Sequence, residues 1–120
     1  MLPGMGSEYV LDTHDYSGTR VVLEYSVWEK HIRREHPDVG DALEQARETI
    51  RNPTLVYEDR GFPRTRLYYR LGAIPKFRYL YLTVVIRFDR QPARVATMYV
   101  TKEPSGSSGR LVYASTRRHD

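Results

Sequence analysis

The chain contains no cysteine among its 120 residues. This absence excludes a disulfide framework, a thiolate metal site and catalysis by a thiol nucleophile. A chain without cysteine suits the reducing cytoplasm. We therefore expect a cytoplasmic protein.

Long apolar runs are missing too. No segment approaches the roughly 20 apolar residues that a membrane helix needs, and Met1 to Val10 lacks the basic flank and apolar run of a signal peptide. The sequence therefore predicts a soluble protein with no membrane partner. With no internal repeat and a length that suits one domain, we expect an irregular lead-in over 1–19, a single domain over 20–115 and a basic tail over 116–120.

Positive charge is concentrated in one part of the chain. Nineteen Lys and Arg residues stand against fifteen Asp and Glu residues, and between Arg60 and Arg94 nine basic residues accompany a single acid, Asp89. Such a segment is typical of a surface that binds a polyanion, and also of a solvated sheet face that carries Arg for solubility. The interleaved tyrosines favour RNA, because bases stack on aromatic rings while phosphates pair with guanidinium groups.

Two helices are predicted between residues 26 and 51. Ser26 and Glu29 have capping-box spacing at the start of the first, and His36-Pro37 closes it because the residue before proline avoids helical geometry. The second runs from about Asp38 to Arg51 and ends at Asn52-Pro53. Its apolar residues have the spacing of a buried stripe: Val39, Ala42, Leu43, Ala46 and Ile50.

Alternating apolar and polar residues predict strands on either side of these helices. The expected strands are Arg20–Tyr25, Thr54–Tyr57, Arg66–Leu71, Tyr79–Phe88 and Val95–Thr101, with Arg110–Ala114 as an edge strand. In the longest strand, Leu82, Val84 and Ile86 share one face, which we assign to the core.

Together these elements predict an α+β fold, with two N-terminal helices packed on one face of a four- to five-stranded antiparallel sheet. The helices cover the apolar face. The opposite face is then expected to carry basic, aromatic and hydroxyl side chains: Arg66, Tyr68, Arg70, Tyr81, Thr83, Tyr99 and Thr101.

His31 and His36 are the leading candidates for proton transfer, because imidazole exchanges protons near neutral pH. Metal-independent RNA cleavage needs a base for the 2′-hydroxyl, an acid for the leaving 5′-oxygen and cations for the phosphorane charge. The two histidines with Arg66 and Arg70 can supply all three. A structural role stays open for each histidine. Glu35 or Trp28 can hold His31 at the core edge, and a helix C-terminus favours His36 through the helix dipole.

We expect neither a metal site nor a cofactor. The two histidines are five residues apart, which puts them on poorly matched helical faces, and the nearby acids are generic. Gly106-Ser107-Ser108-Gly109 lacks the strand-to-helix setting of a phosphate-binding loop or a nucleophile elbow.

One order of motifs extends over roughly Val21 to Lys102. Trp28-x-x-His31-Ile32-x-x-x-His36-Pro37 precedes a helix ending at Asn52-Pro53, then come Leu67-Tyr68-Tyr69, Tyr79-Leu80-Tyr81-Leu82-Thr83-Val84-Val85 and Ala96-Thr97-Met98-Tyr99-Val100-Thr101. This order resembles the phage-associated Barnase/EndoU/colicin/RelE-like (BECR-fold) nucleases. The resemblance implies a two-helix, four-stranded antiparallel domain that cuts RNA without a metal, often as a toxin or phage effector.

The resemblance also assigns roles to residues of this chain. Its helical histidine falls on His31 and His36, its last-strand polar residue on Thr101, and the basic and aromatic hairpin residues on Arg66 and Tyr68. Where relatives often carry further Arg or His, this chain has Lys102-Glu103-Pro104. The expected catalytic residues are His31, His36, Arg66, Tyr99 and Thr101, and the expected RNA-binding residues are Tyr68, Arg70, Tyr81 and Arg87.

Three functions remain open from the sequence. The first is a metal-independent endoribonuclease that acts on RNA, free or ribosome-bound. The second is a non-catalytic RNA-binding or ribosome-docking module that uses the same basic, aromatic face. The third is a toxin-like interaction domain held by an antitoxin or a phage protein.

Overall fold

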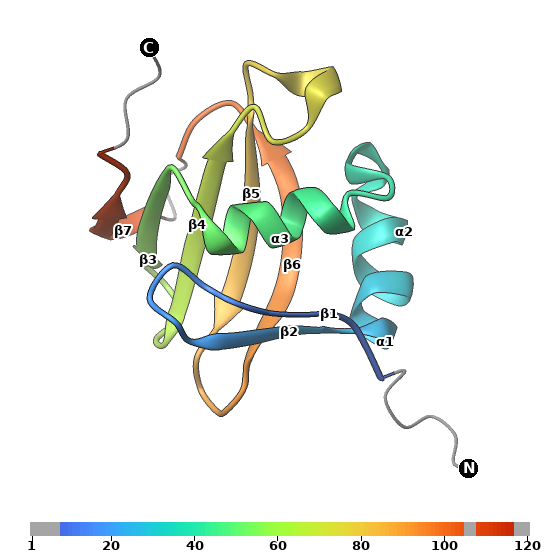
Figure 1. The fold of residues 1–120 in the computed structure, drawn as a ribbon, viewed down its shortest axis with the longest axis horizontal. Coiled ribbons are helices and arrows are strands. Elements are labelled where there is room, and N and C mark those ends of the chain that lie inside the picture. Colours follow the sequence, from blue (N-terminus) through green and yellow to red (C-terminus); the bar gives the residue numbers. More distant parts are fainter. Residues whose placement is uncertain (1–7, 105–107, 117–120) are drawn as a thin grey trace.

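The computed structural model describes residues 8–104 and 108–116. In these residues the strands are β1 (Tyr9–His14), β2 (Arg20–Glu24), β3 (Leu55–Asp59), β4 (Thr65–Leu71), β5 (Tyr81–Arg87), β6 (Ala93–Thr101) and β7 (Ser108–Ala114). They form a single sheet in the order β1-β2-β6-β5-β4-β3-β7 (Figure 1). Beyond Thr116, the expected basic tail lies outside the described residues.

The sheet is mixed. Val21 and Val22 of β2 pair in parallel with Ala93 and Arg94 of β6, and the other paired strands are antiparallel. This short parallel contact joins the β1–β2 hairpin to the five C-terminal strands. Two segments far apart in the sequence thus become neighbours.

The helices occupy two different places. One helical segment comprises α1 (Tyr25–Val27), a π-helical turn (Trp28–Ile32) and α2 (Arg33–Glu35), and it stands beside the edge of β6. After a 3₁₀ turn (Pro37–Val39), α3 (Leu43–Arg51) crosses one face of the sheet (Figure 1). No helix in the described residues is long and apolar enough to span a membrane.

The predicted architecture was therefore wrong, although the chain is α+β. The sequence predicted two helices on a four- to five-stranded antiparallel sheet, whereas α3 alone crosses the face of a seven-stranded mixed sheet. The first helical segment lies at the sheet edge because β2, which leads into it, pairs with β6 at only two positions. The two-helix domain implied by the nuclease resemblance is not observed.

The expected irregular lead-in contains a strand. Residues Tyr9–His14 form β1, in which Leu11 and Thr13 are buried while Asp12 and His14 are exposed. This polar alternation is a strand signal. The signal is weak in the sequence because Leu11 is apolar whereas Thr13, the other buried residue, carries a polar hydroxyl.

The apolar core lies between α3 and the sheet. Ala46 and Ile50 of α3 are fully buried in one cluster with Val84 of β5 and Met98 of β6, as the predicted helical stripe required. Trp28 and Ile32 of the edge segment belong to the same cluster. α3 ends at Arg51, where Asn52-Pro53 was predicted to end it.

Candidate functional site

The strand register divides the predicted RNA-binding face between the two sides of the sheet. Tyr68 pairs with Val84, whose side chain belongs to the core under α3, whereas Tyr69 pairs with Thr83. Because side chains alternate along a strand, Arg66, Tyr68 and Arg70 lie on the α3 side. Thr83 in turn pairs with Tyr99, so the opposite side carries Tyr81, Arg87, Tyr99 and Thr101.

Tyr68 is a core residue and cannot contact RNA. Its side chain is fully buried, and its hydroxyl donates a 2.6 Å hydrogen bond to Oδ2 of Asp15. Oδ1 of Asp15 accepts further hydrogen bonds from the amides of Ser17 and Thr19. Burial, and then the hydrogen bond to Asp15, raise the pKa of Tyr68 well above its usual range. The pair fixes the β1–β2 turn to the core.

The two arginines on the α3 side are also removed from the histidines. The guanidinium of Arg66 lies 5.3 Å from the ring centroid of Phe88. Arg70 donates a hydrogen bond to the carbonyl of Asn52 and lies 3.7 Å from a carboxylate oxygen of Glu48. Neither arginine is placed to stabilise charge beside His31 or His36.

The two histidines, by contrast, lie close together. Their ring centroids are 6.4 Å apart, with the rings nearly perpendicular. The amide of Arg33 bonds the carbonyl of Trp28, five residues back, so this turn is wider than an α-helical turn. Between the two histidines, however, the amide of His36 bonds the carbonyl of Ile32, and His36 itself leaves the helix with φ −131° and ψ 66°. The helical angle that the prediction of mismatched faces assumed therefore does not apply to His36. Nδ1 of His31 is 3.4 Å from Oε1 of Glu35, the partner that the sequence proposed.

His36 also reaches the sheet. Its ring centroid lies 5.6 Å from that of Tyr99 on β6. Burial raises the pKa of the Tyr99 phenol, and Tyr69 and Asp59 act in the same direction. At neutral pH Tyr99 therefore keeps its proton and can donate a hydrogen bond. We call His31, His36 and Tyr99 the edge cluster.

Thr101 follows Tyr99 on the same side of β6, but its hydroxyl donates to the carbonyl of Glu103 at 3.2 Å. The structure thus brings together three of the five expected catalytic residues and leaves Arg66 on the other side of the sheet. Among the described residues, no group of three or more His, Asp or Glu side chains is arranged to hold a metal ion.

The side of the sheet opposite α3 carries a row of tyrosines, and we call it the tyrosine face. Tyr57 and Tyr69 meet edge to face with centroids 6.0 Å apart, and Tyr69 and Tyr81 do so at 5.9 Å. Tyr69 is fully buried, whereas Tyr57, Tyr81 and Tyr99 are partly exposed. Two threonine hydroxyls on this face, Thr83 Oγ1 and Thr97 Oγ1, are buried with no hydrogen-bond partner among the described residues.

The sequence interpretation missed Tyr57 and Tyr69. It placed Tyr68 on the face opposite the helices, and alternation along the strand then put the neighbouring Tyr69 on the core face. Tyr68 and Tyr69 are both fully buried, so apolar alternation carried no information about which side each one takes. The useful signal was the register, since Thr83 and Tyr81 had been assigned to the correct side and Tyr69 pairs with Thr83.

Comparison of the chain with protein-family models, with characterised proteins and with solved structures finds no match. The chemistry of the edge cluster and the tyrosine face is therefore the basis for a functional proposal.

Proposed function

We propose that this protein is a metal-independent endoribonuclease whose acid-base groups are the edge cluster. The observation that carries the proposal is the position of His36, with the ring of His31 at 6.4 Å and that of Tyr99 at 5.6 Å. Hydrogen bonds of about 3 Å on either side of one phosphate span such a separation. The cluster thus has the dimensions needed to serve an attacking and a leaving oxygen.

Each group then has a defined role. His36 takes the proton of a ribose 2′-hydroxyl, and the oxygen attacks the adjacent phosphorus. The bond from phosphorus to the 5′-oxygen breaks, and His31, oriented by Glu35, gives a proton to that leaving oxygen. The Tyr99 phenol donates a hydrogen bond to a non-bridging oxygen, where negative charge accumulates. The products are a 2′,3′-cyclic phosphate and a 5′-hydroxyl.

Single-stranded RNA is the substrate that the neighbouring surface favours. The partly exposed rings of Tyr57 and Tyr81 offer stacking positions, and Arg87 is exposed further along β5 on the same side. The net charge of +4 adds attraction for a polyanion. The proposal includes both free and ribosome-bound RNA as substrates, and either one places the protein in the cytoplasm. An antitoxin or phage partner would act by covering this face.

Cleavage of a fluorescent single-stranded RNA in excess EDTA tests the proposal. His36→Asn should reduce turnover by about 10²-fold or more, the usual cost of losing a general acid or base, while RNA affinity and melting temperature stay nearly unchanged. His14→Asn is the matched control, because His14 is exposed on β1 and belongs to no proposed site.

Three results would overturn the proposal. Binding of RNA by the purified protein without cleavage would leave a binding module. An equal loss of turnover in His36→Asn and His14→Asn would remove the role of His36. Loss of activity in EDTA with recovery on addition of zinc would indicate a metal centre instead.

A further inference from the structure

Two loops meet at one end of the sheet. The loop between β3 and β4 covers residues 60–64, and the loop between β5 and β6 covers residues 88–92. They are neighbours because the amide of Phe88 donates a 2.7 Å hydrogen bond to the carbonyl of Arg64, and because Thr65 pairs with Arg87. Both loops lie at the lower end of the sheet in Figure 1. We call residues 60–64 and 87–90 the basic end.

The positive charge of the basic end has few partners within the protein. Its four arginines are all exposed, and within the described residues none of them takes part in an ion pair: Arg60, Arg64, Arg87 and Arg90. The nearby acids have other partners, since Asp89 lies 3.0 Å from Arg94 and Glu58 lies 3.0 Å from Arg110. The four guanidinium groups are therefore available to an anion.

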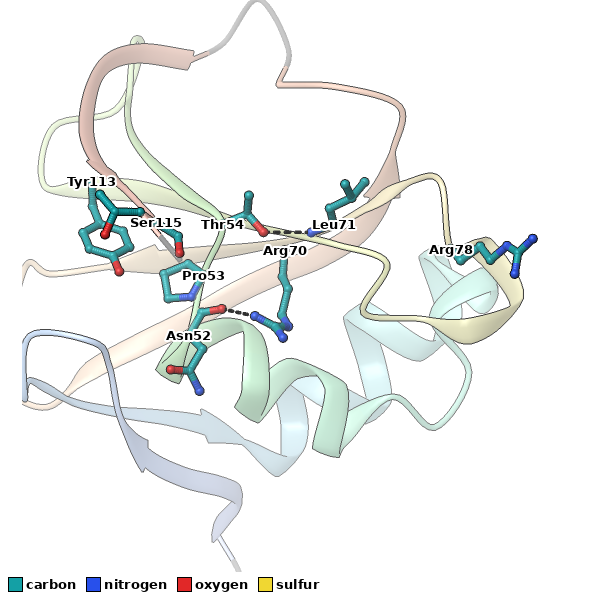
Figure 2. Close-up of a pocket in the computed structure, with 9 residues that line it drawn as sticks. Asn52, Pro53, Thr54, Arg70, Leu71, Arg78, Tyr113 and Ser115 are labelled. Atoms are coloured by element: carbon teal, nitrogen blue, oxygen red, sulfur yellow. Dashed lines mark hydrogen bonds between the residues drawn. The ribbon is translucent and has the colours of Figure 1, made fainter. Parts of the chain in front are cut away.

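The opposite end of β4 lacks such a cluster. There Arg70 donates a hydrogen bond to the carbonyl of Asn52 and lies 3.7 Å from a carboxylate oxygen of Glu48. Figure 2 shows that Arg78, the other arginine of that end, is directed away from Arg70. These two arginines do not combine into one anion site, which leaves the basic end as the concentrated positive surface.

An aromatic ring stands among the arginines of the basic end. Phe62 is 66% exposed at the tip of the β3–β4 loop. Oδ1 of Asp59 accepts hydrogen bonds from the amides of Gly61 and Phe62, at 2.8 and 3.1 Å, and so fixes the backbone that presents the ring. An exposed ring beside cationic side chains offers a stacking position for a base.

Arg64 occupies a strained backbone position. Its φ is +56°, the only positive φ at a non-glycine residue among the described residues. This left-handed region favours glycine, which has no Cβ. The exposed side chain of Arg64 makes no ion pair within the described residues that could offset the strain. An arginine at such a position indicates a role towards a ligand.

The basic end continues the tyrosine face. Thr83 pairs with Tyr99 of the edge cluster, and Arg87 lies on the same side of β5 as Thr83, four residues further along the strand. Four residues of strand span about 13 Å at the usual rise per residue. One RNA strand bound at the edge cluster can therefore extend along β5 to the arginines.

We propose that the basic end binds the backbone phosphates of a single-stranded RNA whose cleaved position lies at the edge cluster, with a base stacked on Phe62. The inference deepens the proposed function and rests on it for the identity of the polyanion. Guanidinium groups pair with phosphates and an aromatic ring stacks on any base, so this surface holds RNA without reading its sequence. Among the described residues of this end, Phe62 is the only large apolar side chain that is exposed, which is too little for insertion into a lipid surface.

Fluorescence anisotropy with a 2′-O-methyl oligoribonucleotide of about 12 nucleotides tests the inference, since this length suits a single-strand site and the strand has no free 2′-hydroxyl to attack. Arg64→Gln should weaken binding about threefold to fivefold, the effect of one exposed ionic contact, and lower the salt slope by about 0.7. Arg51→Gln is the matched control, because Arg51 is exposed at the end of α3, before β3 begins, whereas the basic end follows β3.

Two further variants separate binding from folding and from charge. Arg64→Gly should weaken binding as Arg64→Gln does, while its melting temperature equals or exceeds that of the wild type, because glycine accepts a positive φ. Phe62→Leu should weaken binding without changing the salt slope, because it removes the stacking ring and no charge.

Cleavage kinetics give a second readout. Arg64→Gln should raise KM for an oligoribonucleotide without changing kcat, and a dinucleoside monophosphate, which is too short to reach the basic end, should be cut at the wild-type rate. Equal loss of affinity in Arg64→Gln and Arg51→Gln, or an unchanged salt slope in Arg64→Gln, would overturn the inference. Tighter, Arg64-dependent binding to phosphatidylserine vesicles than to RNA would overturn it too.

The proposed function fails in a different way. His36→Asn should leave the affinity for the 2′-O-methyl strand unchanged. Arg64-dependent binding of this strand by a protein that cuts no RNA would contradict the nuclease proposal and support the binding inference.

Discussion

The hydroxyl of Tyr68 is buried against the carboxylate of Asp15, and this contact joins the β1–β2 turn to the core of the sheet. Tyr68→Phe removes the donor and leaves Oδ2 of a buried carboxylate without it. We expect a loss of about 1.5 to 3 kcal/mol in the free energy of unfolding at pH 7, the range for hydrogen bonds to charged groups. Urea denaturation measures it, and a loss below about 0.5 kcal/mol would mean that Asp15 is satisfied in another way.

The same pair predicts a dependence on alkaline pH. Because burial raises the pKa of Tyr68, the folded chain keeps a proton that the unfolded chain loses near pH 10. The stabilisation is therefore complete below about pH 10 and is lost as the pH rises above it. The stability difference between wild type and Tyr68→Phe should shrink above that pH. A constant difference up to pH 11 would contradict the account.

Thr83 offers a prediction of the opposite sign. Its side chain is fully buried and its hydroxyl has no partner among the described residues, so Thr83→Val should be neutral or stabilising by about 1 kcal/mol. Thr49 is the matched control, because it is equally buried but donates to the carbonyl of Gln45 at 2.8 Å. Thermal melts of both variants make the comparison. A Thr83→Val variant that loses more stability than Thr49→Val would indicate a bound water or ligand beneath the tyrosines.

At the scale of elements, the buried side chains of α3 attach this helix to the face of the sheet. Ile50 is fully buried whereas Leu43, at the start of the helix, is only partly buried. Ile50→Ala should therefore cost about 2 to 5 kcal/mol through lost transfer energy and a cavity, and Leu43→Ala distinctly less. Chemical denaturation of the two variants tests the order. A larger loss for Leu43→Ala would mean that α3 packs with its first turn innermost.

The elements after β1 were largely predictable because each carries its own periodicity. The sequence predicted a strand over Arg20–Tyr25, and β2 ends one residue earlier, at Glu24. It also predicted the end of α3 at Asn52-Pro53, because proline restricts the backbone of the residue before it. The contact between β2 and β6 was not predictable, since it joins residues some seventy positions apart through two pairs. That contact makes the sheet mixed and moves the first helical segment to its edge.

The site was predictable only in part for a related reason. His31, His36 and Tyr99 were chosen for their chemistry, but their proximity follows from the edge position of the helical segment and from the departure of His36 from helical backbone geometry. Tyr68 was assigned to the wrong side because both faces of β4 are buried. A strand with buried side chains on both faces carries no alternation of apolar and polar residues from which its orientation can be inferred.

At the scale of the whole molecule, the sheet separates residues that the sequence expected in one site. His36 lies against Tyr99, which belongs to the tyrosine face, whereas Arg66 and Arg70 lie on the side of α3. The proposed cleavage therefore makes no use of these two arginines.

The most direct test of the central claim is single-turnover cleavage, in EDTA, of an oligoribonucleotide and of the same strand with one 2′-deoxy residue at the cleaved position. If histidine-assisted attack by the 2′-oxygen is the chemistry, the all-ribose strand is cut to a 2′,3′-cyclic phosphate, while the substituted strand binds equally well and stays intact at that position. Cleavage of both strands at equal rates, or of neither, would contradict the assignment of His31, His36 and Tyr99 to this reaction.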